Sequence, residues 1–115
     1  MKKYIDMAKK EIEKELLPYI PIKKYKIIKV YRKKDFLGFY EDTSIYNIPI
    51  IKLNITGIKQ AYIKYSNISL YEIILSTIIH ELGHAIQELR NKNFDENEAE
   101  DFSFNFCRLG IINKI

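Results

Sequence analysis

The sequence predicts an α+β fold in a single domain covering residues 1–115. Apolar residues recur at helical spacing near the N-terminus, and β-branched and aromatic residues mix with lysines in the middle. Two further helical patterns fill the last third. Because helices and strands are segregated along the chain rather than alternating, an α+β arrangement is favoured. The length suffices for one modest hydrophobic core.

The N-terminal element is expected to be an amphipathic helix over residues 2–17. Its apolar residues lie three or four positions apart, which places them on one stripe that can face a core. Two prolines then stop the helix. The stripe consists of Ile5, Ala8, Ile12 and Leu16, and the prolines are Pro18 and Pro21.

The middle of the chain is expected to form a small mixed sheet of three or four strands. Gly38 indicates a turn region, and Thr56 with Gly57 is expected to interrupt the chain. Pro49 fits only near the start of a strand or on a sheet edge. The strand segments are residues 25–32, 48–55 and 61–65, and residues 39–46 are ambiguous between a short strand and a loop.

Two helices follow, each with a capping signal. Ser69 and Glu72 have the spacing of a capping box, which opens a helix expected over residues 70–88. Asp95 or Asn97 opens a last helix to residue 109, where Gly110 stops it. The sequence therefore predicts a helix, a sheet and two final helices.

The composition excludes several classes of protein. The net charge of +4 could allow the protein to bind nucleic acid or an anionic membrane surface. Because the sequence contains no nucleic-acid-binding motif, the lysines are better explained as the solvent-exposed face of a sheet and a helix. No segment approaches the roughly 20 apolar residues of a membrane span. A single cysteine, Cys107, allows no internal disulfide. With no signal-like run at the N-terminus, a cytoplasmic protein is expected.

A metal-site motif lies in the first of the two final helices. Residues 80–84 read His-Glu-Leu-Gly-His, and His80 and His84, four positions apart, share one helix face. Both imidazoles can therefore reach one Zn²⁺ at about 2.0–2.1 Å. Glu81 is expected to be the general base, taking a proton from water activated by the metal. Gly83 is expected where a second backbone packs closely against the helix. The alternative is a pair of core histidines without metal.

A third protein ligand must come from the acidic residues 95–101, because no further histidine exists. About nine residues connect the end of the motif helix to Glu98, which is enough chain to return to the site. Glu98 and Asp101 share a helix face. This favours Glu98 as ligand and Asp101 as a partner that orients a zinc-binding histidine. Alternatively, Glu98 caps the helix that begins after Asp95.

With these residues the chain resembles the gluzincin zinc peptidases, which pair His-Glu-x-x-His with a glutamate on the next helix. The segment 97–99, Asn-Glu-Ala, resembles the thermolysin glutamate motif, and residues 98–102 are similar to the Glu-Ala-x-x-Phe of ImmA/IrrE-type peptidases. The short length and segregated order resemble the minigluzincins, with a minimal zincin-like fold. The resemblance covers residues 61–106.

This resemblance implies a zinc-dependent endopeptidase acting on a peptide or protein, with Glu98 as the third zinc ligand. It also implies a latent zymogen whose C-terminal segment blocks the cleft. A strand containing Gln60, Ala61 and Tyr62 is similar in position to the edge strand along which gluzincins bind substrate, although it could equally be an ordinary strand.

The end of the chain is apolar on more than one helical stripe: Phe102, Phe104, Phe106, Leu109, Ile111 and Ile112. A helix of this kind needs several partners. We expect residues 110–115, or the whole last helix, to pack into a second subunit, giving a homodimer, or across the chain's own cleft. Cys107 is expected to be a buried structural residue rather than a zinc ligand.

Two other functions stay open. The same scaffold could be a zinc-binding regulatory or sensor domain without peptidase turnover. The motif could also be accidental in a basic binding module. The residue that stabilises the oxyanion cannot be chosen among the nine tyrosines, Arg90 and Arg108.

Overall fold

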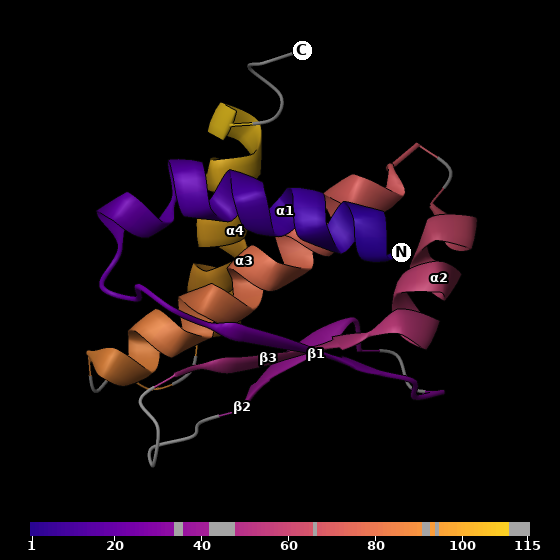
Figure 1. Ribbon diagram of the computed structural model, residues 1–115. Coiled ribbons are helices and arrows are strands. Elements are labelled where there is room, and N and C mark those ends of the chain that lie inside the picture. Colours follow the sequence, from indigo (N-terminus) through magenta and orange to yellow (C-terminus); the bar gives the residue numbers. More distant parts are fainter. Residues whose placement is uncertain (34–35, 42–47, 66, 91–92, 94, 111–115) are drawn as a thin grey trace.

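The computed structural model describes residues 1–33, 36–41, 48–65, 67–90, 93 and 95–110, with only the backbone for 107–110. It confirms the α+β class: helices cover one face of a three-stranded mixed sheet (Figure 1). None of the described helices is both long and apolar enough to cross a membrane. The elements are α1 (Lys2–Glu15), a 3₁₀ turn η1 (Leu17–Tyr19), β1 (Lys26–Val30), β2 (Gly38–Glu41), β3 (Ile50–Asn54), α2 (Ile55–Lys64), α3 (Leu70–Leu89) and α4 (Glu96–Gly110).

The sheet has the strand order β1-β3-β2. The central strand β3 is parallel to β1 and antiparallel to β2, and Ile51 lies opposite Ile27 on one side and Tyr40 on the other. Ile51 and Leu53 alternate with more exposed residues and are completely buried, as the two-residue period of a strand requires. Within the described residues, β2 has no strand on its other side, so it is an edge strand.

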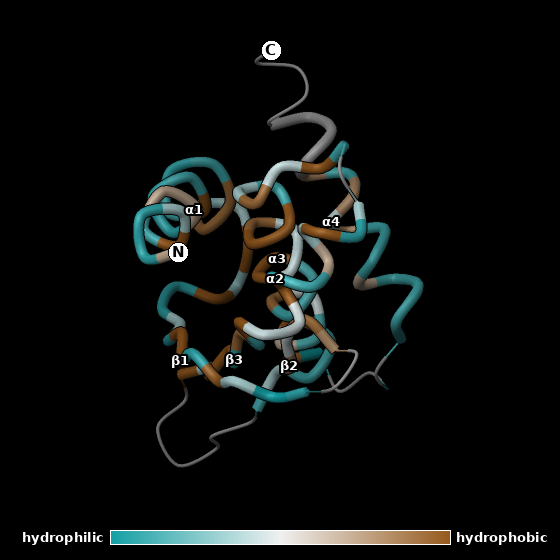
Figure 2. Tube along the Cα trace, turned by 90° about the vertical axis from the view of Figure 1, so that its right-hand side faces the viewer, coloured by the Kyte–Doolittle hydropathy of each residue, from teal (hydrophilic) through white to brown (hydrophobic). Residues whose placement is uncertain are grey.

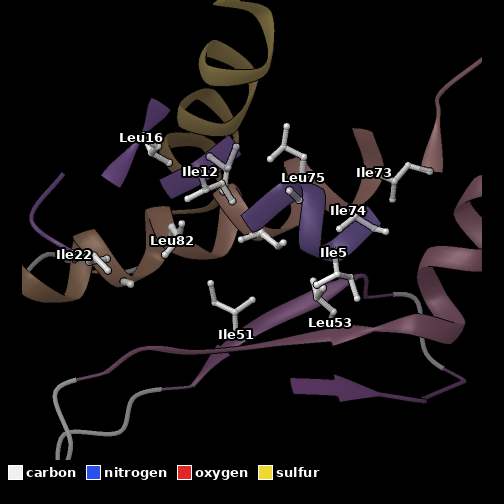
Figure 3. Close-up of a cluster of buried hydrophobic side chains, with 14 of the residues drawn as sticks. Ile5, Ile12, Leu16, Ile22, Ile51, Leu53, Ile73, Ile74, Leu75 and Leu82 are labelled. Carbon is white, nitrogen blue, oxygen red and sulfur yellow. The ribbon is translucent and has the colours of Figure 1, made fainter. Parts of the chain in front are cut away.

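The core lies between the sheet and the helices, with α3 at its centre. Helix α3 packs against α1, α2 and α4 and against strands β2 and β3. The N-terminal stripe predicted from the sequence is confirmed, because Ile5, Ala8, Ile12 and Leu16 are all buried. Figure 3 shows side chains from α1, α3 and β3 pointing toward one another in this layer. Figure 2 shows the hydrophobic segments gathered around α3, and hydrophilic ones on the outer side of α1.

The prediction of a strand at residues 61–65 is wrong, and so is the predicted interruption of secondary structure at Thr56 and Gly57. Residues 56, 57 and 61–64 belong to α2, and Tyr65 is its C-cap. Ile55 and Ile58, three positions apart, are buried on the face of this helix that meets the core. Gly57 serves close packing, since a Cβ there would lie 2.5 Å from the Phe36 carbonyl oxygen. The β-propensity of residues 61–65 is thus outweighed by the burial of the helical face that contains Ile55 and Ile58.

Tyr25, just before β1, offers a test of this packing. Its hydroxyl is buried and has no hydrogen-bond partner within the described residues. Burial, and then the negative charge of Glu13, raise the pKa of the phenol far above its usual value. A raised pKa means that the neutral form stabilises the fold below the unfolded pKa of about 10, and that this contribution is lost as the pH rises further.

Replacing Tyr25 by phenylalanine is therefore expected to stabilise the protein by about 1 kcal/mol near neutral pH, because it removes an unsatisfied hydroxyl. The variant should also lose less stability between about pH 7 and about pH 10.5. Urea unfolding followed by circular dichroism at both pH values checks this. Tyr19→Phe is the control, because Tyr19 is 83% exposed. A Tyr25→Phe protein less stable than the wild type would contradict the absence of a partner.

Candidate metal centre

Helix α3 brings the two histidines of the chain together. It begins at the expected cap, where the Ser69 hydroxyl accepts a hydrogen bond from the Glu72 backbone N–H at 3.1 Å. One turn of this helix separates His80 from His84, and their ring centroids lie 5.0 Å apart. His84 is 4% exposed. The prediction that His80 and His84 share one face of the helix is confirmed.

Both histidines direct Nε2 at the carboxylate of Glu96, in the first turn of α4. The distances are 2.9 Å from His80 and 2.8 Å from His84. A lone-pair nitrogen and a carboxylate oxygen both accept hydrogen bonds, so each contact requires a ring proton or a metal ion at the nitrogen. Glu96 itself is 77% exposed. The two Nε2 atoms therefore point at one position that favours positive charge.

Glu81 is buried beside the histidines. Burial raises the pKa of its carboxyl, and Glu96 adds to the rise, while the two imidazoles and a hydrogen bond from the Tyr40 backbone oppose it. A raised carboxyl pKa suits proton transfer near neutral pH. Ligand atoms of His80, Glu81 and His84 lie within 4.8 Å of one another, which is close enough for one metal ion.

No protein-family model matches the chain. Neither does any curated protein or solved structure. The donor set itself fits a metal: imidazole nitrogens and carboxylate oxygens are the usual ligands of zinc and of several other divalent ions. The outer ring nitrogens are occupied as well, since His80 Nδ1 lies 2.8 Å from Glu100 Oε2 and His84 Nδ1 lies 2.9 Å from Gln87 Oε1. Such contacts orient histidine ligands in metal sites.

The structure does not bring Glu98 into this group. Its Oε1 atom accepts a hydrogen bond from Gln87 Nε2 at 3.1 Å, one side chain away from His84. The carboxylate in contact with both Nε2 atoms is Glu96 instead. Glu96 and Glu100 are four positions apart and face α3 together, whereas Glu98 lies about half a turn away. The backbone N–H of Glu98 also joins the helix cap, at 3.1 Å from Asp95 Oδ1.

Asp101 as an orienting partner is likewise a correction. Asp101 is exposed, and the residues that contact the outer nitrogens of the histidines are Glu100 and Gln87. Glu100 was not predicted from the sequence, because the helix face shared by Glu98 and Asp101 was favoured there. Gln87 had a signal, since it is a polar residue three positions after His84 on an otherwise apolar helix, and it is 1% exposed.

Gly83 lies where α4 crosses α3, as expected for a close backbone approach. A Cβ at this position would lie 3.2 Å from Ala99 Cα and 3.3 Å from a Phe102 ring atom. Ala99 is completely buried. Small residues on both helices thus let α4 approach closely enough for its first turn to reach the histidines.

A pocket of about 470 Å³ lies over the motif, between α3, the first turn of α4 and strand β2. Its walls include the edge strand at Gly38, Phe39 and Tyr40. Gly38 begins this strand and is not in a turn. It allows β2 to lie against α3, because a Cβ there would come 2.8 Å from the Thr77 methyl group and 3.7 Å from Glu81 Cγ.

The predicted substrate strand is wrong in its residues. Gln60, Ala61 and Tyr62 lie on helix α2, and none of them lines this pocket. The edge strand that borders the pocket is β2. The isoleucine and tyrosine content of residues 61–65 favours a strand on composition alone. For β2, Gly38 indicates a turn and residues 39–46 are ambiguous between a strand and a loop, so the sequence does not identify this strand.

The last helix extends to Gly110, as expected. Phe102 and Phe106 pack against the core, while Phe104 is 58% exposed. The predicted covering of the cleft or of a second subunit concerns residues 110–115 or the whole last helix, and residues 111–115 of that segment lie outside the described residues. The side chain of Cys107 does so as well. Latency, dimerisation and the role of Cys107 stay predictions.

Proposed function

We propose that this protein is a zinc-dependent endopeptidase of the gluzincin type. The observation that carries the proposal is the convergence of His80 and His84 Nε2 on one position, with a buried carboxylate, Glu81, beside it. This is the donor arrangement of a hydrolytic zinc site, with two imidazoles for the metal and one group for proton transfer.

Three side chains would hold the ion: His80, His84 and Glu96. Glu96 is favoured over Glu98 by its contacts with both rings. When bound there, zinc would supply a Lewis acid for the substrate carbonyl and for a water molecule. Glu100 keeps the outer nitrogen of His80 occupied, so that Nε2 is the nitrogen left for a metal.

Glu81 would act as the general base. Its burial favours the proton-accepting role, because the raised pKa of its carboxyl lies nearer to neutrality than that of an exposed glutamate. It takes a proton from the attacking water and later passes it to the leaving amine. The Tyr40 backbone hydrogen bond holds this carboxylate at the wall of the pocket.

A peptide substrate would lie along β2. Within the described part of the chain, β2 pairs with a strand on one side only, so an extended peptide could add to its other side through backbone hydrogen bonds. Gly38, Phe39 and Tyr40 already border the pocket, so a peptide paired there would pass over Glu81 and the histidines. Two carboxylates, those of Glu96 and Glu100, also line this pocket.

Zinc analysis combined with a peptide-cleavage assay tests the proposal. Purified protein is expected to bind one zinc ion per chain, and a mixed peptide library should be cleaved by the full chain or by a chain ending at Leu109. The trimmed chain tests latency, since higher activity after trimming would support a blocking C-terminal segment. Bound zinc without cleavage in either form would favour the regulatory or sensor function. Protein that binds no zinc would contradict both.

A further inference from the structure

The outward face of α2 and the turn after it expose large apolar side chains. Ile63 is 81% exposed, and Tyr62, Tyr65 and Ile68 are between 36% and 49% exposed. Ile63 lies on the other side of the helix from Ile58, which is completely buried in the core. Figure 1 shows α2 at the edge of the molecule, with the turn leading from it into α3. These side chains are therefore presented to the surroundings of the protein.

Positive charge accompanies these four side chains. Lys59 and Lys64 are both exposed. Lys59 precedes Ile63 by one helical turn, so both lie on the outward face. Lys64 Nζ lies 5.4 Å from the centroid of the Tyr65 ring, in a cation–π arrangement. Residues 43–71 of the sequence contain no aspartate or glutamate. We refer to the four apolar or aromatic side chains and the two lysines as the α2 surface.

The exposed side of α1 has a different composition. It carries both signs of charge, with Lys3 and Lys10 exposed together with Asp6 and Glu13, and Figure 2 shows it as hydrophilic. Mixed charges of this kind are typical of a face that contacts only water. Exposed tyrosine and isoleucine with lysine and without acids are instead typical of segments that lie at the boundary between water and an anionic lipid layer.

The backbone of this segment is hydrogen-bonded within the protein. The Tyr65 N–H donates to the Ala61 carbonyl at 2.9 Å, and the Ile68 N–H donates to the Tyr65 carbonyl at 3.2 Å. Paired backbone groups can enter the headgroup region of a lipid layer without losing hydrogen bonds to water. Helix α2 also packs against α3, β1 and β3. The α2 surface is therefore already ordered before it meets a partner, which lowers the entropic cost of binding.

We propose that the α2 surface docks this protein on an anionic lipid membrane. Ile63 and the rings of Tyr62 and Tyr65 would lie among the headgroups, because a tyrosine ring is apolar while its hydroxyl is polar. Lys59 and Lys64 would lie beside the negative charges of the lipids. Within the described part of the chain, none of these residues lines the pocket over the histidines. Docking thus involves no group proposed for catalysis and does not depend on the metal.

Co-sedimentation of the full chain with lipid vesicles tests the proposal. Vesicles of phosphatidylcholine mixed with phosphatidylserine should bind the protein, less so as the salt concentration rises, and vesicles of phosphatidylcholine alone should bind it far more weakly. The double variant Lys59→Gln/Lys64→Gln should partition into the anionic vesicles roughly 30-fold less, since each lysine near such a surface contributes about fivefold. Lys3→Gln/Lys10→Gln is the control with the same change of net charge on α1, and should differ from wild type by less than about twofold.

A fluorescent reporter tests which part of the protein meets the lipid. The chain contains no tryptophan, so Tyr62→Trp places a single one in the α2 surface. Tyr19→Trp places one at a position that is 83% exposed elsewhere. Anionic vesicles should shift the emission of the first variant toward the blue and leave that of the second unchanged. Ile63→Ser should bind roughly 10-fold more weakly, whereas Leu89→Ser, at a position 59% exposed on α3, should bind as wild type does.

Three results of the vesicle experiment would overturn the proposal: no binding to either kind of vesicle, equal binding to both, or equal losses in the two lysine variants. Binding to soluble polyglutamate but not to vesicles would also overturn it, and would indicate an acidic protein as the partner. A lipid-free dimer that Ile63→Ser converts into a monomer would assign the α2 surface to a second copy of the chain instead. The substituted side chains are exposed, so circular dichroism should show each variant folded as the wild type is.

Discussion

Replacing Glu81 by glutamine is expected to lower peptide cleavage by roughly 10²–10⁴-fold, the usual contribution of a general base. Zinc affinity should change little, because His80, His84 and Glu96 are unaltered. Glutamine has nearly the same shape and can still face the Tyr40 backbone, so the pocket should keep its form. Initial cleavage rates and zinc stoichiometry of the two proteins are the measurements.

Glu72→Gln is a suitable control for this experiment. Glu72 lies on the same helix, in its first turn, and does not line the pocket. Its replacement should leave the cleavage rate unchanged. Persistent cleavage in Glu81→Gln, with zinc bound, would show that another group takes the proton.

The second large effect concerns the glutamate that completes the metal site. Glu96→Gln is expected to weaken zinc binding by at least about 100-fold, since it removes the charged partner of both Nε2 atoms. Glu98→Gln should weaken it only a few-fold, because an amide oxygen can still accept from Gln87. Isothermal titration of the two variants compares them directly.

The reverse order of effects would support the assignment made from the gluzincin resemblance. It would also mean that α4 turns by about half a turn when zinc binds, because residues 96 and 98 lie roughly 200° apart around a helix. Equal losses in both variants would contradict each single-ligand assignment. The two substitutions are the same chemical change at positions only two residues apart on one helix, so each variant serves as the control of the other.

The features that could be predicted from the sequence are those whose pattern follows the period of a single helix or strand. His80 and His84 are fixed relative to each other by the helical spacing alone, and Ser69 marks where their helix begins. The α1 stripe and the strong strand around Ile51 could be predicted for the same reason. Each of these signals depends on the period of a single helix or strand, which neighbouring elements do not alter.

Relations between elements could not be predicted in this way. The rotation of α4 about its axis decides between Glu96 and Glu98, and it depends on how Ala99 packs against Gly83. Likewise, the 61–65 segment has strand composition, but Ile55 and Ile58 bury a helical stripe that begins before it. The role of β2 depends on Gly38, whose contact with Thr77 arises only once the sheet meets α3.

The helix that carries both histidines is also the helix around which the rest of the domain packs. The arrangement of His80 and His84 therefore depends on the folded core. As a consequence, ligand binding to these two histidines is thermodynamically linked to folding. A cation held by His80 and His84, at a free concentration 100 times its Kd, would add about 2.7 kcal/mol to the free energy of unfolding. The melting temperature of the whole domain thus becomes a reporter of what these two side chains hold.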